Sequence, residues 1–332
     1  MSVSITKRFY FSCAHQYPGH PVITQNSFVN SINQTRFGSN FELFVSVSGK
    51  VNPDSGMVLP LAQLKQLILP IIDQDFDHHY LSYATSIAHI SSALFRQISD
   101  TIPQQLALRQ ILLMNEAGEG ALTCKSNTHS ILALGERQEV KISDPGQAFT
   151  ENIDSVIQFE GALQSESFFA NCDALLNRFP TISLTVQLKP TIAAVLTKDR
   201  NSLIFDYWFS FPHQVNNAML TDNDNQSLFG RCINCHGHNF RLRVTITEAQ
   251  WADEDVRSDW HNKLNSALTE IAHTFESAFV GQLGTCEHLL QSTLGLCLLK
   301  KFPEITELQL RETENNFITQ EFHPNDHLSH FH

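Results

Sequence analysis

Two stretches of the chain alternate strictly between hydrophobic and polar residues. The hydrophobic positions are Phe41, Leu43, Val45 and Val47 in the first stretch, and Phe240, Leu242, Val244 and Ile246 in the second. A period of two is typical of a β-strand that buries one face. Each stretch therefore predicts a strand with a hydrophobic side and a polar side.

Hydrophobic residues at helical spacing follow the first of these strands. One helix is predicted from the stripe Leu61, Leu64, Ile68 and Ile71. A second helix is predicted from about Ile87 to Ile98, with Ile90 and Leu94 in the same register. We interpret both stripes as core contacts and not as cofactor contacts.

The two halves of the chain repeat one pattern about 200 residues apart. Residues 11–15 resemble residues 209–213, and residues 112–116 resemble residues 308–312. Each half therefore predicts two strands, two helices and at least one further strand.

This repeat defines the expected domains. We expect an N-terminal unit at 1–125, an ordered α/β connector at 126–200, a C-terminal unit at 201–322 and a polar, histidine-rich tail at 323–332. In the connector, the hydrophobic pattern predicts a helix around residues 168–179 and a strand that ends at Pro190.

The composition restricts the class of protein. The chain has 332 residues, of which 42% are hydrophobic and 17% are charged, as is typical of a globular protein with a sizeable core. No apolar run reaches the roughly 20 residues of a membrane helix. The net charge of -12 argues against a nucleic-acid partner. Seven cysteines, an odd number, do not suggest a disulfide framework, so we expect a cytoplasmic location.

His213, Cys232, His236 and His238 are the residues that point most directly to chemistry. A strand that carries His-x-His places both residues on one face, and a third histidine can come from a neighbouring strand. Three imidazoles with an open fourth position suit a catalytic zinc ion (Zn2+), because water or substrate must reach the metal.

Two other interpretations of this segment stay open. Residues 232–236 read C-x-x-C-H, the attachment pattern of a c-type haem, although the N-terminus has no apolar core of a signal peptide for export. A redox pair or a structural zinc site at Cys232 and Cys235 is the second alternative, although no second C-x-x-C completes a four-thiolate site.

The halves differ in the residues that could carry chemistry. Residues 37–39 (Phe-Gly-Ser) align with residues 236–238 (His-Gly-His), so we expect the first half not to bind zinc. Conversely, Asp77 and His78 align with residues 277–278, which are Ser and Ala. An aspartate beside a histidine can orient an imidazole for proton transfer. The complementary pattern predicts one composite site made from both halves.

Six short motifs follow one another along these halves. They are F-S-x-x-H, C-x-x-x-H-G-H-N-F, G-M-V at 56–58, D-H-H-Y-L at 77–81, T-x-E at 285–287 and R-E-T at 311–313. Together they resemble the 6-pyruvoyl tetrahydropterin synthase and 6-carboxytetrahydropterin synthase family. The resemblance covers roughly residues 3–124 and 202–322.

The resemblance implies a fold and a reaction. The fold is α+β, with two tandem tunnelling-fold (T-fold) units, each an antiparallel four-stranded sheet with two helices on one face, which assemble into barrels. The reaction is that of a zinc-dependent lyase, which eliminates triphosphate from 7,8-dihydroneopterin triphosphate or a related dihydropterin and rearranges the side chain. Six units form one particle in many members of the family, so we expect a homotrimer.

The resemblance also implies roles for individual residues. Zinc would be bound by His213, His236 and His238, and Cys232 would transfer a proton as an acidified thiolate. Asp77 and His78 would form the proton relay and would reach the site from a neighbouring unit. Glu312 would anchor the pterin by accepting two N–H bonds, Thr285 would be a further pterin contact, and Glu116 is an alternative anchor in the first half.

The spacing and the departures of the motifs bear on the product and on activity. Three residues separate Cys232 from His236, which resembles the carboxy-forming bacterial enzymes of queuosine synthesis and favours 6-carboxytetrahydropterin as the product. However, Ile87 replaces the glutamate of T-x-E in the first half, and residues 256–258 replace G-M-V in the second. The alternative is therefore a catalytically silent protein that binds a pterin or a purine.

Overall fold

The protein forms two compact units, each assembled from segments that are distant in sequence. The computed structural model describes residues 3–16, 36–115, 119–125, 127–134, 140–145, 172–177, 182–278, 280–281, 284–313 and 315–322. Unit 1 contains residues 1–7, 47–64 and 202–332, and unit 2 contains residues 8–46 and 65–201. The segment around the G-M-V motif of the first half therefore belongs to the same unit as the second half.

Unit 1 is built on an antiparallel sheet in which β10, β11, β13 and β14 are successive neighbours. The first residues of β1 pair with β14, and the end of β10 pairs with the short β12. These strands are β1 (Val3–Gln16), β10 (Asn201–Val215), β11 (His236–Thr247), β12 (Val280–Gly281), β13 (Ile305–Thr313) and β14 (Asn316–Glu321). The helical segments are α4 (Asp222–Phe229), η2 (Gly230–Ile233), α5 (Glu254–Ala278), α6 (Cys286–His288), η3 (Leu289–Leu294) and α7 (Gly295–Lys301).

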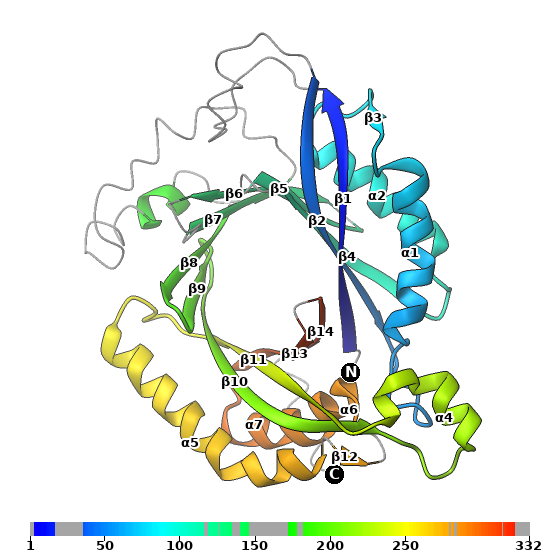
Figure 1. Ribbon diagram of the computed structural model, residues 1–332. Coiled ribbons are helices and arrows are strands. Elements are labelled where there is room, and N and C mark those ends of the chain that lie inside the picture. Colours follow the sequence, from blue (N-terminus) through cyan, green and yellow to red (C-terminus); the bar gives the residue numbers. More distant parts are fainter. Residues whose placement is uncertain are drawn as a thin grey trace. The chain divides into compact units, whose positions relative to one another are not determined.

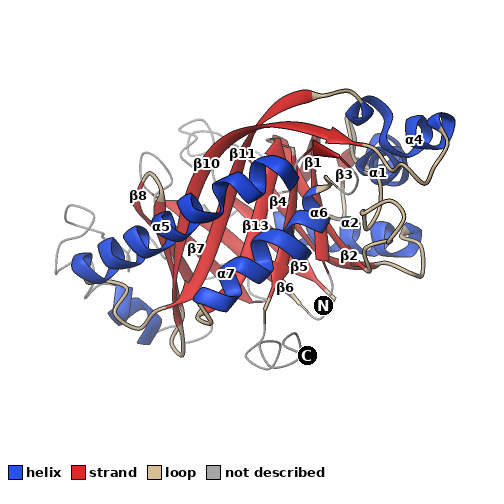
Figure 2. Cartoon of the chain, turned by 90° about the horizontal axis from the view of Figure 1, so that it is seen from below, coloured by secondary structure: helices blue, strands red, loops and turns tan. Residues whose placement is uncertain are grey.

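One face of this sheet is covered by helices. Figure 2 shows α5 and α7 lying across β10, β11 and β13. The alternating residues predicted from the sequence, Phe240, Leu242, Val244 and Ile246, are all completely buried. The predicted period of two is thus confirmed, and it leaves Arg241, Arg243 and Thr245 for the opposite face of the sheet.

Unit 2 contains a longer sheet in the order β1, β2, β4, β5, β6, β7, β8 and β9. From β4 onward, each strand is antiparallel to the next. The strands are β2 (Arg36–Gly49), β4 (Ala107–Asn115), β5 (Glu119–Cys124), β6 (Thr128–Leu134), β7 (Val140–Pro145), β8 (Ser183–Lys189) and β9 (Ile192–Leu196), and the short β3 (Tyr80–Leu81) pairs with β1.

The two predicted helices of the first half are present. They are α1 (Leu61–Asp75) and α2 (Ile87–Thr101), which lie beside β1 and β2 in Figure 1. In α2 the predicted residues Ile90, Leu94 and Ile98 are fully buried, and the Ser86 side chain caps the first turn by accepting a hydrogen bond from the His89 N–H.

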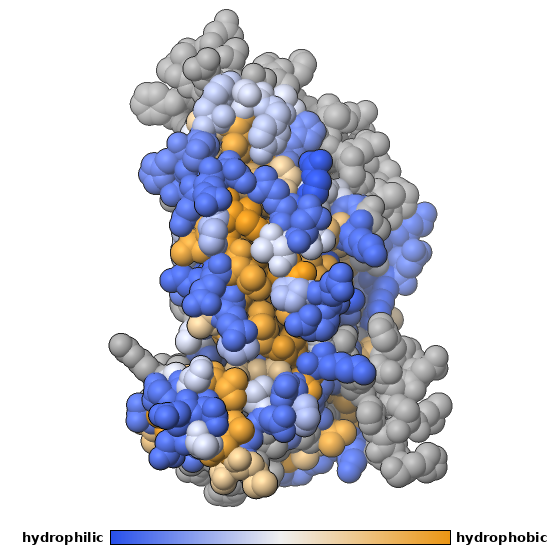
Figure 3. Space-filling view, turned by 90° about the vertical axis from the view of Figure 1, so that its right-hand side faces the viewer, coloured by the Kyte–Doolittle hydropathy of each residue, from blue (hydrophilic) through white to orange (hydrophobic). Residues whose placement is uncertain are grey.

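The buried stripe of α1 differs from the predicted one. Leu64 and Ile68 are fully buried as expected, but the next buried residue is Ile72, whereas Leu61 and Ile71 are only half-buried. Spacings of four residues keep this stripe on one line along the helix, so Ile71 lies at its edge. Figure 3 views the side that carries these helices and shows a strip of hydrophobic residues bordered by hydrophilic ones.

The connector continues the sheet of unit 2. The predicted helix is observed at 172–177, and the predicted strand before Pro190 is β8. Strands β6, β7 and β9 were not predicted, because they are short and their stability depends on pairing with neighbours. The observed fold is therefore a mixed α/β fold with extensive antiparallel sheet. None of the helices in the described ranges combines the length and the hydrophobicity that a membrane-spanning helix needs.

Candidate active site

The register of β10 and β11 brings together the positions of the three predicted zinc ligands. His213 is directly opposite His236, and His238 follows two residues later along β11. Residues opposite one another in an antiparallel pair share a face, as do residues two apart in a strand. Positions 213, 236 and 238 thus lie on one face at the end of this strand pair. The side chains of these histidines lie outside the described part of the structure.

Cys232 lies in η2, just before β11, and is half-buried. The preceding Gly230 has a φ of 55°, a left-handed conformation that glycine adopts without strain. Burial, with a further contribution from the charge of Glu312, raises the pKa of the Cys232 thiol. The protein groups described around Cys232 thus disfavour the thiolate, so the acidification implied by the family would have to come from a nearby cation.

Two carboxyl groups, those of Glu287 and Glu312, interact electrostatically in unit 1. Glu287 is 5% exposed, and burial raises its pKa to about 7, with a further increase from Glu312 that backbone N–H groups partly offset. Cys286 is also buried, and its pKa is raised well above the usual value by burial and by Glu312 and Glu287. Cys232, Cys286, Glu287 and Glu312 therefore form one electrostatically connected cluster in unit 1. Sequence reasoning noted Glu287 in the T-x-E motif but gave it no role.

The loop that carries the G-M-V motif is bound to this cluster. The Thr285 hydroxyl donates a hydrogen bond to the carbonyl oxygen of Gly56, and the backbone of Val58 contributes a hydrogen bond to Glu287. Gly56 requires its glycine, because its φ is 68° and its N–H donates to the carbonyl of Asn52 at 2.8 Å. A motif of the first half and a motif of the second half are thus joined by hydrogen bonds within unit 1.

The hydroxyl of Thr285 is already occupied in two ways. It donates to Gly56 and accepts a hydrogen bond from the His288 N–H at 3.3 Å, which caps the N-terminus of α6. These contacts favour a positioning role for Thr285, in addition to the pterin contact that the family implies.

Asp77 and His78 form a hydrogen-bonded pair in unit 2. The Asp77 carboxylate accepts a hydrogen bond from the Ser12 N–H at 2.8 Å and lies 2.7 Å from Nδ1 of His78. The Ser12 N–H is the main cause of the lowered pKa of Asp77, and His78 lowers it further. His78 has a φ of 59°, and its side chain is 82% exposed. Asp77 therefore holds the His78 ring at Nδ1, and the rest of the ring is exposed to a second hydrogen-bonding partner. This geometry is expected of a proton relay.

Some of the predicted site residues lie outside the part of the chain that the structure describes. Glu116 is one of them. Among the side chains that are described, no group of three or more His, Cys, Asp or Glu could hold a metal ion, but His213, His236 and His238 are not in that set.

Comparison with known proteins finds a family similarity in the first half. Residues 4–123 match the family model of 6-pyruvoyl tetrahydropterin synthase. The resemblance to this family is confirmed there. A 6-pyruvoyl tetrahydrobiopterin synthase of Dictyostelium discoideum is 27% identical over 126 residues, which cover 33% of this chain and 87% of that protein.

A solved structure also resembles part of the chain. The 6-pyruvoyl tetrahydropterin synthase of Caenorhabditis elegans aligns at 19% identity over 38% of this chain and 97% of its own, with a TM-score of 0.31. The family model covers the half of the chain that contains Asp77 and His78.

Proposed function

We propose that this protein is a zinc-dependent pterin synthase whose site combines residues of both sequence halves. One observation carries the proposal: the Gly56–Val58 loop of the first half is hydrogen-bonded to Thr285 and Glu287, within the cluster that contains Cys232 and Glu312. The family match over residues 4–123 supports a pterin as the substrate.

The residues at the end of β10 and β11 fit a zinc ion. Histidine is a preferred zinc ligand, and the register places positions 213, 236 and 238 on one face. His213, His236 and His238 would hold the metal and leave a position open. Zinc at this position would supply a Lewis acid that polarises oxygen atoms of the substrate side chain.

Each of the remaining residues has a defined task in this proposal. Glu312 would accept two N–H bonds from the guanidine-like edge of the pterin, and the buried Glu287 would hold the Gly56–Val58 loop beside it. Cys232 would exchange protons with the substrate side chain. Asp77 would orient His78, which would relay the proton.

The proposed substrate is 7,8-dihydroneopterin triphosphate, which would lose its triphosphate and undergo rearrangement of the side chain. The spacing between Cys232 and His236 favours 6-carboxytetrahydropterin as the product, as in queuosine synthesis. The second candidate is a catalytically silent protein that binds a pterin or a purine, which is favoured by Ile87 in place of the T-x-E glutamate of the first half and by the loss of G-M-V at residues 256–258.

Product identification separates these candidates. Zinc-loaded protein is incubated with 7,8-dihydroneopterin triphosphate, and the products are identified by mass. We expect triphosphate and a side-chain-modified pterin from the wild type, and no product from Cys232→Ala, which should still bind zinc. A pterin that binds but is recovered unchanged with the wild-type protein would support the silent alternative.

The relay has a matched control in the same segment. Asp77→Asn should lower turnover by roughly 100-fold or more, because His78 loses its orienting carboxylate. Asp75→Asn changes an exposed carboxylate two residues away and should retain full turnover. Equal turnover in Asp77→Asn and Asp75→Asn would show that Asp77 has no role in the reaction.

A further inference from the structure

The segment between β10 and β11 carries Cys232 and contains two buried asparagines. Asn217, just after β10, is 3% exposed, and Asn225, in the middle of α4, is 4% exposed. An asparagine side chain has two N–H donors and an oxygen acceptor, so its burial is costly unless these groups find partners. The partners of the two side chains therefore show what holds this segment in place.

The two asparagines bind one another through side chain and backbone. The Asn217 N–H donates to Oδ1 of Asn225 at 2.8 Å, and Nδ2 of Asn225 donates to the carbonyl oxygen of Asn217 at 3.0 Å. The Asn225 amide also donates to the carbonyl oxygens of Leu220 and Thr221, at 3.3 and 3.2 Å. These bonds fasten the turn after β10 to α4, and we call Asn217 and Asn225 the asparagine clamp.

The Asn217 side chain connects the clamp to a distant part of the sequence. Its Nδ2 donates to the carbonyl oxygen of Asp54 at 2.5 Å, and these two residues are 163 positions apart. Asp54 precedes Gly56 in the loop that Thr285 already binds. A local turn before α4 does not require this bond. The Asn217 side chain thus joins the segment of Cys232 to the loop of the G-M-V motif, within unit 1.

The loop that receives this bond is closed by its own hydrogen bonds. Oδ1 of Asn52 accepts from the N–H groups of Asp54 and Ser55, at 2.7 and 3.1 Å. The Asn52 N–H donates to the carbonyl oxygen of Met57 at 2.9 Å, and the Asn52 carbonyl oxygen accepts from the Gly56 N–H. Asparagine bonds of this kind fix a turn, so the position of the Asp54 carbonyl determines the positions of its neighbours.

Cys232 is also held at the other end of its segment. α4 ends at the buried Phe229, and the chain continues through Gly230 directly into η2. Nε2 of Gln214, at the end of β10, donates to the carbonyl oxygen of Ile233 at 2.9 Å. Hydrogen bonds before and after Cys232 thus restrict its movement relative to the loop.

We propose that Asn217 and Asn225 are positioning residues of the pterin reaction. The clamp holds the segment of Cys232 against the Gly56–Val58 loop, so that the thiol keeps one position relative to the bound pterin. Both asparagines act through Cys232 and not by contact with the substrate. The inference rests on the proposed function, because that reaction is what gives Cys232 its task. Proton transfer depends steeply on geometry, and a displacement of about 1 Å can lower a rate roughly 100-fold.

Asn217→Asp removes the donor without changing the size of the side chain. The oxygen that replaces Nδ2 would repel the Asp54 carbonyl, whereas the other oxygen can still accept from the Met219 N–H. We expect kcat per bound zinc ion to fall by roughly 10- to 100-fold, with KM for 7,8-dihydroneopterin triphosphate changed by less than about threefold. A purely structural role would lower the melting temperature and leave kcat per bound zinc ion unchanged. Asn217→Ala also removes the bond and introduces no buried charge, so it serves if Asn217→Asp does not fold.

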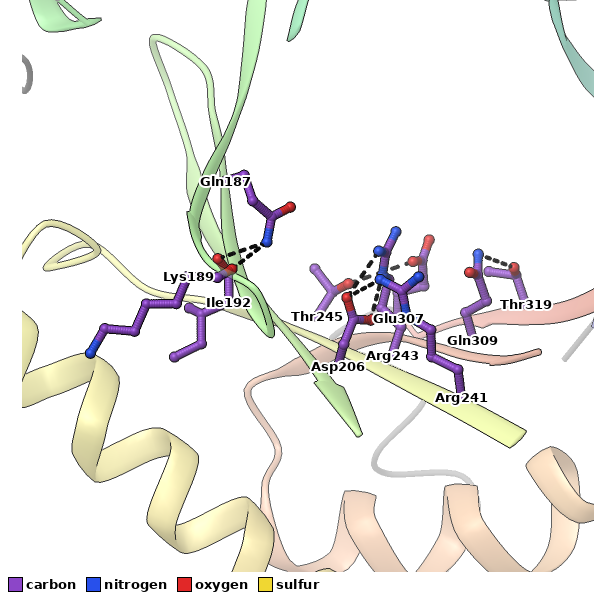
Figure 4. A network of polar contacts seen from close by, with 10 residues as sticks. All are labelled: Gln187, Lys189, Ile192, Asp206, Arg241, Arg243, Thr245, Glu307, Gln309 and Thr319. Atoms are coloured by element: carbon purple, nitrogen blue, oxygen red, sulfur yellow. Dashed lines mark hydrogen bonds and ion pairs between the residues drawn. The ribbon is translucent and has the colours of Figure 1, made fainter. Parts of the chain in front are cut away.

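Gln309→Met is the matched control for loss of a partly buried amide. The Gln309 amide donates to the Thr319 hydroxyl at 3.2 Å. Gln309 lies between the buried Leu308 and Leu310 in β13, so its side chain is on the opposite face of the sheet from theirs. Figure 4 shows Gln309 and Thr319 on the side of the strands away from the helices. Because the lost bond lies within the sheet and not at the loop, this variant should keep the wild-type kcat and KM.

Alkylation of the cysteines tests the clamp without turnover. Cys232 is half-buried, and Cys235 in the same segment is exposed, so it provides an internal reference. Iodoacetamide at fixed pH, followed by tandem mass spectrometry, gives both rates in the full-length protein. Release of the clamp in either Asn217 variant should raise the rate of Cys232 relative to Cys235 by about threefold or more, because local opening exposes the thiol. Gln309→Met should leave this ratio unchanged.

Three outcomes would overturn the proposal. They are wild-type kcat per bound zinc ion in the Asn217 variants, an equal loss of kcat in Gln309→Met, and an unchanged ratio of Cys232 to Cys235 alkylation in the Asn217 variants. Failure of the proposed function would be visible separately, as a wild-type protein that forms no product although release of the clamp still changes the alkylation ratio.

Discussion

At the scale of single residues, burial decides the charge state of the candidate site. Glu287 is enclosed in unit 1 with Glu312 and Cys286 nearby, so its carboxyl group keeps a proton at a pH where an exposed glutamate is ionised. A protonated carboxyl can both donate and accept hydrogen bonds, which suits a group that holds a loop by its backbone.

The raised pKa of Glu287 predicts a pH-dependent stability. Its pKa is about 7 in the folded protein and 4.5 as the reference value, so the folded state binds more protons between these limits. The free energy of unfolding should therefore fall as pH rises from about 4.5 through 7, by on the order of 3 kcal/mol at most. Glu287→Gln should remove this decrease, measured by urea denaturation at pH 5 and pH 8. A wild-type profile that is parallel to that of the variant would contradict the assignment.

At the scale of elements, the segment after Thr285 connects the loop to the sheet. The short α6 continues into η3, a π-helix at Leu289–Leu294, and then into α7. π-Helical turns are rare and frequently occur at functional sites. This one follows the T-x-E motif directly and buries Leu289, Leu290 and Leu294, so it fixes the position from which Thr285 reaches Gly56.

Thr285→Val should release the loop that carries Gly56. The variant keeps the shape of the side chain but leaves the buried Gly56 carbonyl without its donor, which should reduce the free energy of unfolding by about 1–3 kcal/mol. Thr285→Ser retains the hydroxyl, so its free energy of unfolding should fall by less than half of that amount. Chemical denaturation compares the three proteins, and equal losses in both variants would show that the hydrogen bond is unimportant.

At the scale of the whole molecule, the two halves contribute different chemistry. His236 and His238 occur only in the second half, and the equivalent residues of the first half are Phe37 and Ser39. The Asp77–His78 pair occurs only in the first half. Each half therefore lacks what the other keeps, and a site of the proposed kind needs both.

This asymmetry predicts about one zinc ion per chain, because only one complete set of three histidines is present. His236→Ala should lose the metal, and His89→Ala, which changes an exposed histidine in α2, should keep it. Metal analysis after dialysis measures the ratio. Two zinc ions per chain would show that the first half also binds the metal.

The proposed assembly is a homotrimer. Its mass by analytical ultracentrifugation should be about three times the 37.5 kDa of one chain. A monomer at micromolar concentration would contradict the assembly but not the zinc stoichiometry.

The sequence by itself determined the local elements and the residue types of the candidate site. Burial was predicted correctly from the period of two in residues 240–246 and from the helical spacing of Ile90, Leu94 and Ile98. Both patterns depend only on residues that are close in sequence. The motifs also indicated the family that residues 4–123 match.

Only the tertiary structure decided which distant residues meet. The bond from Thr285 to Gly56, the pKa of Glu287, the strands of the connector and the pairing of Arg241 with Arg311 all depend on strand register and on burial by remote segments. Register results from many weak contacts between parts of the chain that are far apart, so no local pattern contains it. The same physical reason explains why the histidines could be listed from the sequence, whereas the hydrogen bond between Thr285 and the loop of Gly56 could not.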